Sequence, residues 1–176
     1  METCRWIPEA GNGIEHLTLR RDGAGLFAQG AVIGDDFGAF YTIRCDSAWR
    51  VRHALVEVAG GARLELHADG AGRWQDGQGV SVPALAGCID IDLTASCFTN
   101  TLPVRRLGAA LASRHEIAVA WVHLPALTVE AARQAYTRIA PRLVRFESLG
   151  SGFMADLTVD DEGLVVHYPG LFRRID

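Results

Sequence analysis

The stretch Gly87–Leu107, GCIDIDLTASCFTNTLPVRRL, concentrates polar side chains between apolar anchors. Near its start, Asp90 and Asp92 alternate with apolar residues, which predicts a strand with one acidic face and one apolar face. Near its end, Arg105 and Arg106 are adjacent. Two carboxylates, an amide and two guanidinium groups so close together indicate an internal polar network or a ligand site.

The middle of this stretch predicts a short helix. Thr99 or Asn100 is a suitable N-cap, and Pro103 falls in the first turn that would follow. Because Arg105 and Arg106 are neighbours on that helix, their side chains diverge by about 100°. We therefore expect one arginine to point at the polar site and the other at solvent or a partner.

Outside this stretch, hydrophobic residues recur mostly with a period of two, and turn signals follow at short intervals. The turn signals are Asp22-Gly23, Gly34-Asp35, Gly60-Gly61, Asp69-Gly70, Asp76-Gly77 and Glu162-Gly163. Short strands joined by such turns predict an antiparallel sheet rich in hairpins, most clearly over residues 62–76 and 153–168.

Three segments add to this prediction. Residues 115–124 are apolar on both faces, which predicts a strand covered on both sides, so the sheet must wrap around something. In residues 48–58 the apolar face switches near His53–Leu55, as a β-bulge would cause. Thr128–Ala140 fits either a helix capped by Thr128 or a strand, and both interpretations stay open.

Composition places the chain among ordinary globular proteins. It has 176 residues, of which 49% are hydrophobic and 22% charged, with no composition shift or linker, so we expect one domain over residues 1–176. All 17 basic residues are arginine, yet the formal net charge of -4 argues against a nucleic-acid partner. No run of residues approaches the roughly 20 apolar positions of a membrane span.

The cysteines and the first residues suggest a compartment. Cys4, Cys45, Cys88 and Cys97 are too widely spaced for a zinc knuckle or a redox pair. The first residues have no apolar region of a secretory signal. We therefore expect a cytoplasmic protein with free thiols. Histidines lack partners at metal-ligand spacing and no nucleotide fingerprint is present, so the spacing predicts no metal and no cofactor.

Several segments together resemble a known family. These are GCIDIDLTASCFTNTLPVRRL, YTIRCDSAWRVR (Tyr41–Arg52), the Asp76-Gly77 turn after Trp74, Gln134-Ala-Tyr136 and GLVVHYPGLFRR (Gly163–Arg174). In this order they resemble the bacterial family described as putative glycolipid-binding proteins, over nearly the whole chain. The most specific part is FTNTLPVRRL (residues 98–107), and one departure is Cys97, where family members often carry proline.

The resemblance implies a fold and a binding role. The fold is a spiral β-roll, all-β apart from one short helix, in which a long antiparallel sheet wraps around that helix. A homodimer is implied as well. The roll is similar to the half-open barrels of periplasmic lipoprotein carriers, which hold acyl chains. The resemblance favours the helix at Asn100–Leu107 and a strand at Thr128–Ile139, and it implies no catalytic residue.

Three interpretations of Asp90 and Asp92 stay open. They face solvent or pair with an arginine such as Arg44, Arg50, Arg105 or Arg106; or they take sugar hydroxyls while arginines take a phosphate or carboxylate; or they form an acid/base pair of a hydrolase or lyase. Trp74 is the tryptophan best placed to stack on a sugar or lie along a lipid tail.

The leading hypothesis is a lipid or glycolipid-like amphiphile bound between sheet and helix, and a structural or protein-interaction domain is the remaining alternative. The candidate ligand-binding residues are Asp90, Asp92, Asn100, Arg105, Arg106, Trp74, Arg44 and Tyr136. Of these, we expect Asp90, Asp92, Asn100 and Arg105 to form one connected polar unit.

Overall fold

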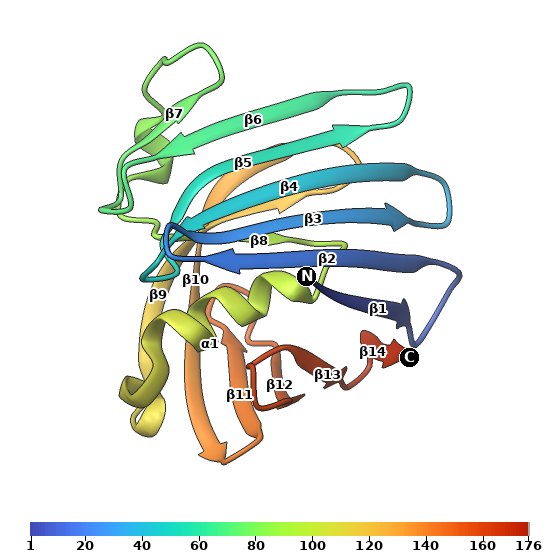
Figure 1. Cartoon of the computed structure of the whole chain (residues 1–176), viewed down its shortest axis with the longest axis vertical. Coiled ribbons are helices and arrows are strands. Elements are labelled where there is room, and N and C mark those ends of the chain that lie inside the picture. Colours follow the sequence, from blue (N-terminus) through green and yellow to red (C-terminus); the bar gives the residue numbers. More distant parts are fainter. Residues whose placement is uncertain (176) are drawn as a thin grey trace.

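The computed structural model describes residues 1–175, which form a 14-stranded sheet curled over one short α-helix (Figure 1). The strands are β1 (Glu2–Pro8), β2 (Ile14–Asp22), β3 (Gly25–Ile33), β4 (Gly38–Asp46), β5 (Val51–Val58), β6 (Arg63–Ala68), β7 (Trp74–Asp76), β8 (Asp90–Leu93), β9 (His115–His123), β10 (Thr128–Ala140), β11 (Leu143–Ser148), β12 (Met154–Val159), β13 (Val165–Tyr168) and β14 (Phe172–Ile175). The helical elements are α1 (Thr101–Leu107) and the 3-10 turns η1 (Pro83–Leu85), η2 (Phe98–Asn100) and η3 (Gly108–Ala112).

The strand order explains how the sheet becomes a roll. It runs β7-β6-β5-β4-β3-β2-β1-β14-β13-β12-β11-β10-β9-β8, so β1 and β14 pair in the middle of the sheet. All strand pairs are antiparallel except β8 with β9. The β8 end of the sheet approaches β5, the third strand from the other end, where the Val51 amide donates to the Ile89 carbonyl, 3.4 Å away. The all-β prediction with one short helix is confirmed.

The ambiguous segment Thr128–Ala140 is a strand. β10 pairs with β9 on one side and with β11 on the other, so backbone hydrogen bonds to two neighbours outweigh its helical spacing. The hairpins expected over residues 62–76 and 153–168 are present as β6–β7 and β12–β13. No helix among residues 1–175 is long and apolar enough to cross a membrane.

The helix begins where the sequence predicts, but without the expected cap. Asn100 occupies the N-cap position, yet its side chain makes no capping hydrogen bond. The preceding turn η2 already supplies acceptors, because the Asn100 amide donates to the Cys97 carbonyl and the Thr101 amide to the Phe98 carbonyl. The orphan donors of the helix start are therefore partly satisfied by backbone, and the Asn100 side chain is free for another contact.

Two other predictions about strands are confirmed in substance. In β9, Val119 and Ala120 lie on opposite faces and are only 1% and 0% exposed, so the strand is covered on both sides. The register between β4 and β5 shifts by one residue: Arg44 pairs with His53, whereas the next residue, Cys45, pairs with Val51. The bulge thus falls just before the predicted position.

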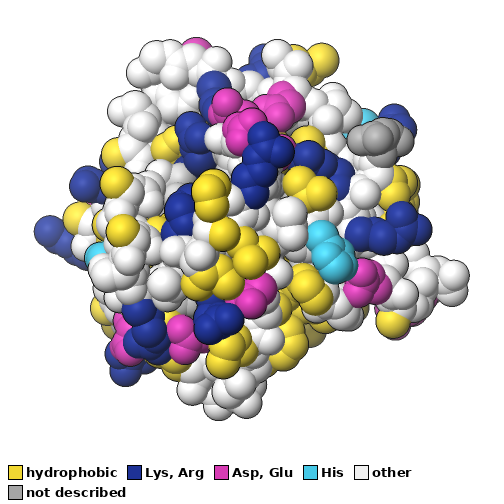
Figure 2. Space-filling view, turned by 90° about the horizontal axis from the view of Figure 1, so that it is seen from below, with side chains coloured by type: hydrophobic (Ala, Val, Ile, Leu, Met, Phe, Trp, Pro, Cys, Tyr) yellow, Lys and Arg dark blue, Asp and Glu magenta, His cyan; other side chains and the backbone are white. Residues whose placement is uncertain are grey.

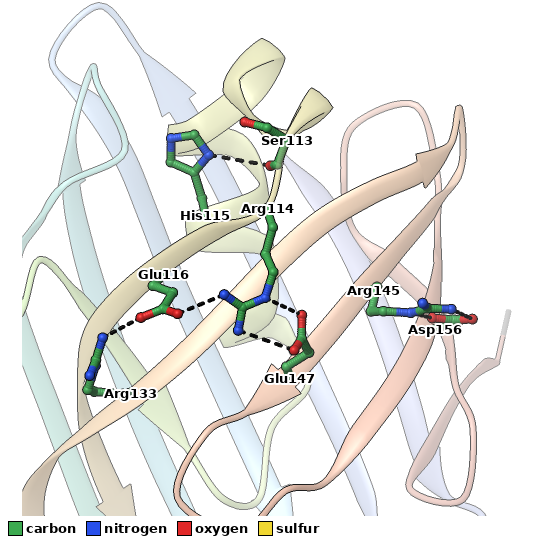
Figure 3. A network of polar contacts seen from close by, with 8 residues as sticks. All are labelled: Ser113, Arg114, His115, Glu116, Arg133, Arg145, Glu147 and Asp156. Atoms are coloured by element: carbon green, nitrogen blue, oxygen red, sulfur yellow. Dashed lines mark hydrogen bonds and ion pairs between the residues drawn. The ribbon is translucent and has the colours of Figure 1, made fainter.

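Ion pairs cover the outer surface of the later strands. Figure 3 shows Glu116 between Arg114 and Arg133, with Arg114 also donating to Glu147 at 2.9 Å. These side chains are substantially exposed, so each pair contributes little to stability. Many of the arginines therefore form solvent-exposed ion pairs. The polar side chains of the candidate site differ from these because they are buried.

Candidate functional site

A cavity of about 350 Å³ lies among strands β8–β11, the turn before β12, the segment before α1, the end of β13 and the start of β14. Its wall has a polar part and an aromatic part. The polar side chains are Asp92, Thr94, Ser96, Asn100, Gln134, Ser148 and Ser151, and the aromatic ones are Trp121, Phe146, Phe153, Tyr168 and Phe172. This division makes the cavity suited to a molecule with two chemically different ends.

A chain of hydrogen bonds builds the polar part. The side-chain amide of Asn100 donates from Nδ2 to the Tyr136 hydroxyl at 2.9 Å, and that hydroxyl donates to Gln134 Oε1 at 3.1 Å. Gln134 Nε2 then donates to Asp92 Oδ2 at 2.6 Å, while Thr99 Oγ1 donates to Asp92 Oδ1 at 2.9 Å. Each bond fixes the orientation of the next side chain, so Asp92 is held rigidly at the cavity wall.

The electrostatics of Asp92 follow from this position. Burial raises the pKa of Asp92, and the hydrogen bonds from Thr99 and Gln134 oppose the rise. No basic side chain donates a hydrogen bond or forms an ion pair with it within residues 1–175. Its remaining lone pairs can accept hydrogen bonds from hydroxyl groups of a ligand.

The aromatic side chains other than Trp121 form a continuous cluster. The Tyr168 ring centroid lies 6.0 Å from that of Phe146, 6.3 Å from Phe153 and 6.5 Å from Phe172. Phe153 is 42% exposed and Leu171, which also lines the cavity, is 41% exposed. The cavity lining therefore reaches the surface at these two apolar side chains.

Asp90 does not belong to this cavity wall. It is fully buried and pairs with Arg106, whose Nε lies 3.0 Å from Oδ1 and whose Nη2 lies 2.5 Å from Oδ2. The prediction that Asp90, Asp92, Asn100 and Arg105 form one unit is wrong on two points. First, Asp90 is separate from Asp92 and Asn100. Second, the arginine that pairs with Asp90 is Arg106 and not Arg105, because Arg106 lies on the side of the helix that faces β8.

Arg105 points the other way. Its guanidinium lies 5.0 Å from the Trp49 ring centroid and 3.6 Å from a Glu162 carboxylate oxygen. Glu162 also accepts from Arg21. Figure 2 shows arginine and acidic side chains lying next to one another on the face seen from below. The two arginines diverge as expected, with Arg106 turned inward to Asp90 and Arg105 turned to the surface, but neither lines the cavity.

Two further candidates lie outside the cavity wall. Trp74 is 1% exposed and donates from Nε1 to the Cys88 carbonyl at 2.8 Å, so it is a core residue. Arg44 is exposed, and its guanidinium lies 4.5 Å from the Phe27 ring centroid. Both were placed at the site by sequence, but Trp74 packs inward and Arg44 lies on the outer face of β4.

A second, smaller cavity of about 200 Å³ contains a residue that sequence reasoning missed. Glu15 is 2% exposed, and its Oε1 accepts from the Tyr41 hydroxyl and from Ser96 Oγ, each at 2.5 Å. Its Oε2 has no hydrogen-bond partner within residues 1–175. Burial raises the pKa of Glu15 to about 7, against the effect of both hydroxyl groups.

A cluster able to bind a metal also escaped the spacing analysis. His53, Glu65 and His67 present ligand atoms that all lie within 4.8 Å of one another. The spacing of histidines along the sequence, which predicts no metal site, does not reveal this cluster, because the residues come from two strands that meet only through the register of β5 and β6.

Comparison with known proteins agrees with this architecture. The family model described as "Putative glycolipid-binding" matches residues 3–174. A crystal structure of a DUF1089 family protein from Pseudomonas aeruginosa, at 1.80 Å resolution, superposes with a TM-score of 0.81. It is 40% identical in sequence, and the match covers 97% of this chain and 95% of that one. No curated protein matches. The chain therefore belongs to the family described as putative glycolipid-binding.

Proposed function

We propose that this protein binds one amphiphilic molecule, a lipid or glycolipid, with its hydroxylated head group in the 350 Å³ cavity. The observation that carries the proposal is the division of the cavity wall into a carboxylate–amide part and an aromatic part. Asp92 would accept hydrogen bonds from hydroxyl groups of the head group. The rings of Phe146 and Tyr168 would pack on the apolar faces of the head group. The family description supports the same class of ligand.

The size of the cavity limits how the ligand lies. A volume of 350 Å³ is at the small end of ligand pockets, with room for a head group but not for a whole lipid. The apolar chain would therefore leave the cavity past Phe153 and Leu171. These two side chains are 42% and 41% exposed, although apolar, and would gain burial when covered.

An acid/base role of Asp92 is the second candidate. A carboxyl group with a raised pKa that lines a cavity is a common feature of catalytic acids. The two-carboxylate version with Asp90 has little support, because Asp90 is occupied by Arg106 and does not line the cavity. Asp92 would therefore act alone, and conversion of a bound ligand to product would distinguish this hydrolase or lyase from a binding protein.

A pair of neighbouring substitutions on β10 tests the site. Ala132 lines the cavity, whereas Ala131 is exposed on the opposite face of the strand. We expect Ala132→Phe to weaken binding of octyl glucoside, used below its critical micelle concentration, by at least about tenfold, because the ring fills the cavity. Ala131→Phe should bind like the unmodified protein. Isothermal titration calorimetry measures both.

Two outcomes would contradict the proposal. Equal effects of the two variants would mean that the probe binds elsewhere. Organic extraction of the purified protein followed by mass spectrometry should recover an amphiphile from the unmodified protein and less of it from Ala132→Phe. Repeated recovery of no lipid, together with no binding of octyl glucoside, would refute the cavity as a binding site.

The cytoplasmic location and the homodimer remain proposals. All four cysteines are free and buried, which supports a protein that needs no disulfide. The edge strands β7 and β8 have only three and four residues, so little sheet edge needs a partner. The dimer therefore rests on the sequence resemblance, and light scattering at micromolar concentration tests it.

A further inference from the structure

The cluster of His53, Glu65 and His67 lies on the outer face of the β5–β6 hairpin. Ala54 and Leu66, the neighbours of the two histidines, are 2% and 1% exposed and point into the core. Side chains alternate between faces of a strand, so the histidines point outward. His53 and His67 are direct partners in the register of the two strands, and their ring centroids lie 4.9 Å apart.

The distances match those between ligands of one zinc ion. Glu65 Oε1 lies 3.1 Å from His53 Nε2 and 3.6 Å from His67 Nε2. Donor atoms at about 2.0–2.1 Å from a tetrahedral Zn²⁺ lie roughly 3.3 Å from one another. Glu65 therefore already stands at ligand distance from both histidines, and small side-chain rotations would complete the set.

The surroundings orient Glu65 for this role. Arg63 Nη2 donates to Glu65 Oε2 at 2.8 Å, which leaves Oε1 directed at the two histidines. Such outer hydrogen bonds to a ligand carboxylate are typical of metal sites. Arg44 on β4 is the strand partner of His53. Its guanidinium lies over the Phe27 ring and not beside the cluster.

We infer that His53, Glu65 and His67 bind a divalent transition metal ion, Zn²⁺ in the first place, with water in the fourth position. Two imidazoles and one carboxylate form a ligand set that zinc sites use, and the two imidazole nitrogens favour Zn²⁺ over Mg²⁺ or Ca²⁺, which prefer oxygen ligands. Three protein ligands leave one coordination position open. The site lies on the outer face of the sheet and does not depend on the ligand proposed for the main cavity.

Titration with zinc chloride tests the inference on the full chain. We expect one Zn²⁺ per chain, bound at least about tenfold more weakly by His67→Ala, because one of three ligands is lost. His67 is 47% exposed at its side chain, so this variant should fold, which circular dichroism checks. A Co²⁺ complex of the unmodified protein should show the visible absorption of a tetrahedral site, and the variant should lose it.

A histidine–glutamate pair that has no third ligand among residues 1–175 provides the matched control. His123 Nε2 lies 3.0 Å from Glu130 Oε1, much like His53 and Glu65. His123→Ala should bind Zn²⁺ as tightly as the unmodified protein. No binding of Zn²⁺ by the unmodified protein, or equal affinity in the unmodified protein and His67→Ala, would overturn the assignment.

Discussion

Replacing Arg106 with alanine should lower the free energy of unfolding by about 3 kcal/mol, because it leaves a buried carboxylate without its partner. Asp90 has no exposed side-chain surface, and the Arg106 side chain is 16% exposed. The two groups form a forked ion pair with both carboxylate oxygens engaged. Urea unfolding of the variant and of the unmodified protein at pH 7 measures the difference.

The neighbouring arginine is the control. Arg105 and its partner Glu162 are 32% and 50% exposed at their side chains, so Arg105→Ala should cost about 1 kcal/mol or less. The double variant Asp90→Ala, Arg106→Ala should cost clearly less than the sum of its single changes, because neither charge is then stranded. Similar costs for Arg105→Ala and Arg106→Ala, or simple additivity with Asp90→Ala, would mean that the buried pair is not coupled.

The buried Glu15 should make stability depend on pH near neutrality. Its pKa is about 7 in the folded protein, against 4.5 for the ordinary group. Between these values the folded state holds a proton that the unfolded state has lost, so the free energy of unfolding falls as pH rises through this window. The loss is complete above pH 7 and amounts to about 3 kcal/mol, at about 1.4 kcal/mol per pKa unit.

Glu15→Gln should remove this pH dependence. Glutamine stays neutral and keeps an acceptor oxygen for the Tyr41 and Ser96 hydroxyl groups. The stability of the variant relative to the unmodified protein should therefore rise by about 3 kcal/mol from below pH 4.5 to above pH 7, measured by urea unfolding at pH 4.5, 6 and 8.

Glu162→Gln provides a control of opposite sign. The hydrogen bond from Arg21 lowers the pKa of Glu162, so that its ionised form stabilises the folded state. Relative to the unmodified protein, this variant should lose stability as pH rises through the acidic range. A difference between Glu15→Gln and the unmodified protein that stays constant with pH would show that the pKa of Glu15 is the same in the folded and unfolded states.

The sequence does contain signals for Glu15 and for the histidine pair. They appear only when each residue is assigned to one face of its strand. Leu17 and Leu19 mark the inner face of β2, and Glu15 shares their parity, so its burial follows from the period of two. His53 and His67 are equidistant from Gly60 in the turn between β5 and β6, which is the pairing that the structure shows. Both signals concern the position of a residue on a strand rather than its spacing from a motif.

Local sequence determined the elements of this protein, and the curl of the sheet decided its site. The period of two and the Asp-Gly and Gly-Gly turns specify hairpins, and Gly87–Leu107 specifies a strand followed by a helix, because these depend on neighbours in the chain. One partner of Asp92 is Gln134, 42 positions away, and one partner of Glu15 is Ser96, 81 positions away. Such contacts depend on which strands the roll brings face to face, since alternation assigns a side chain to a face but not to a partner across the interior.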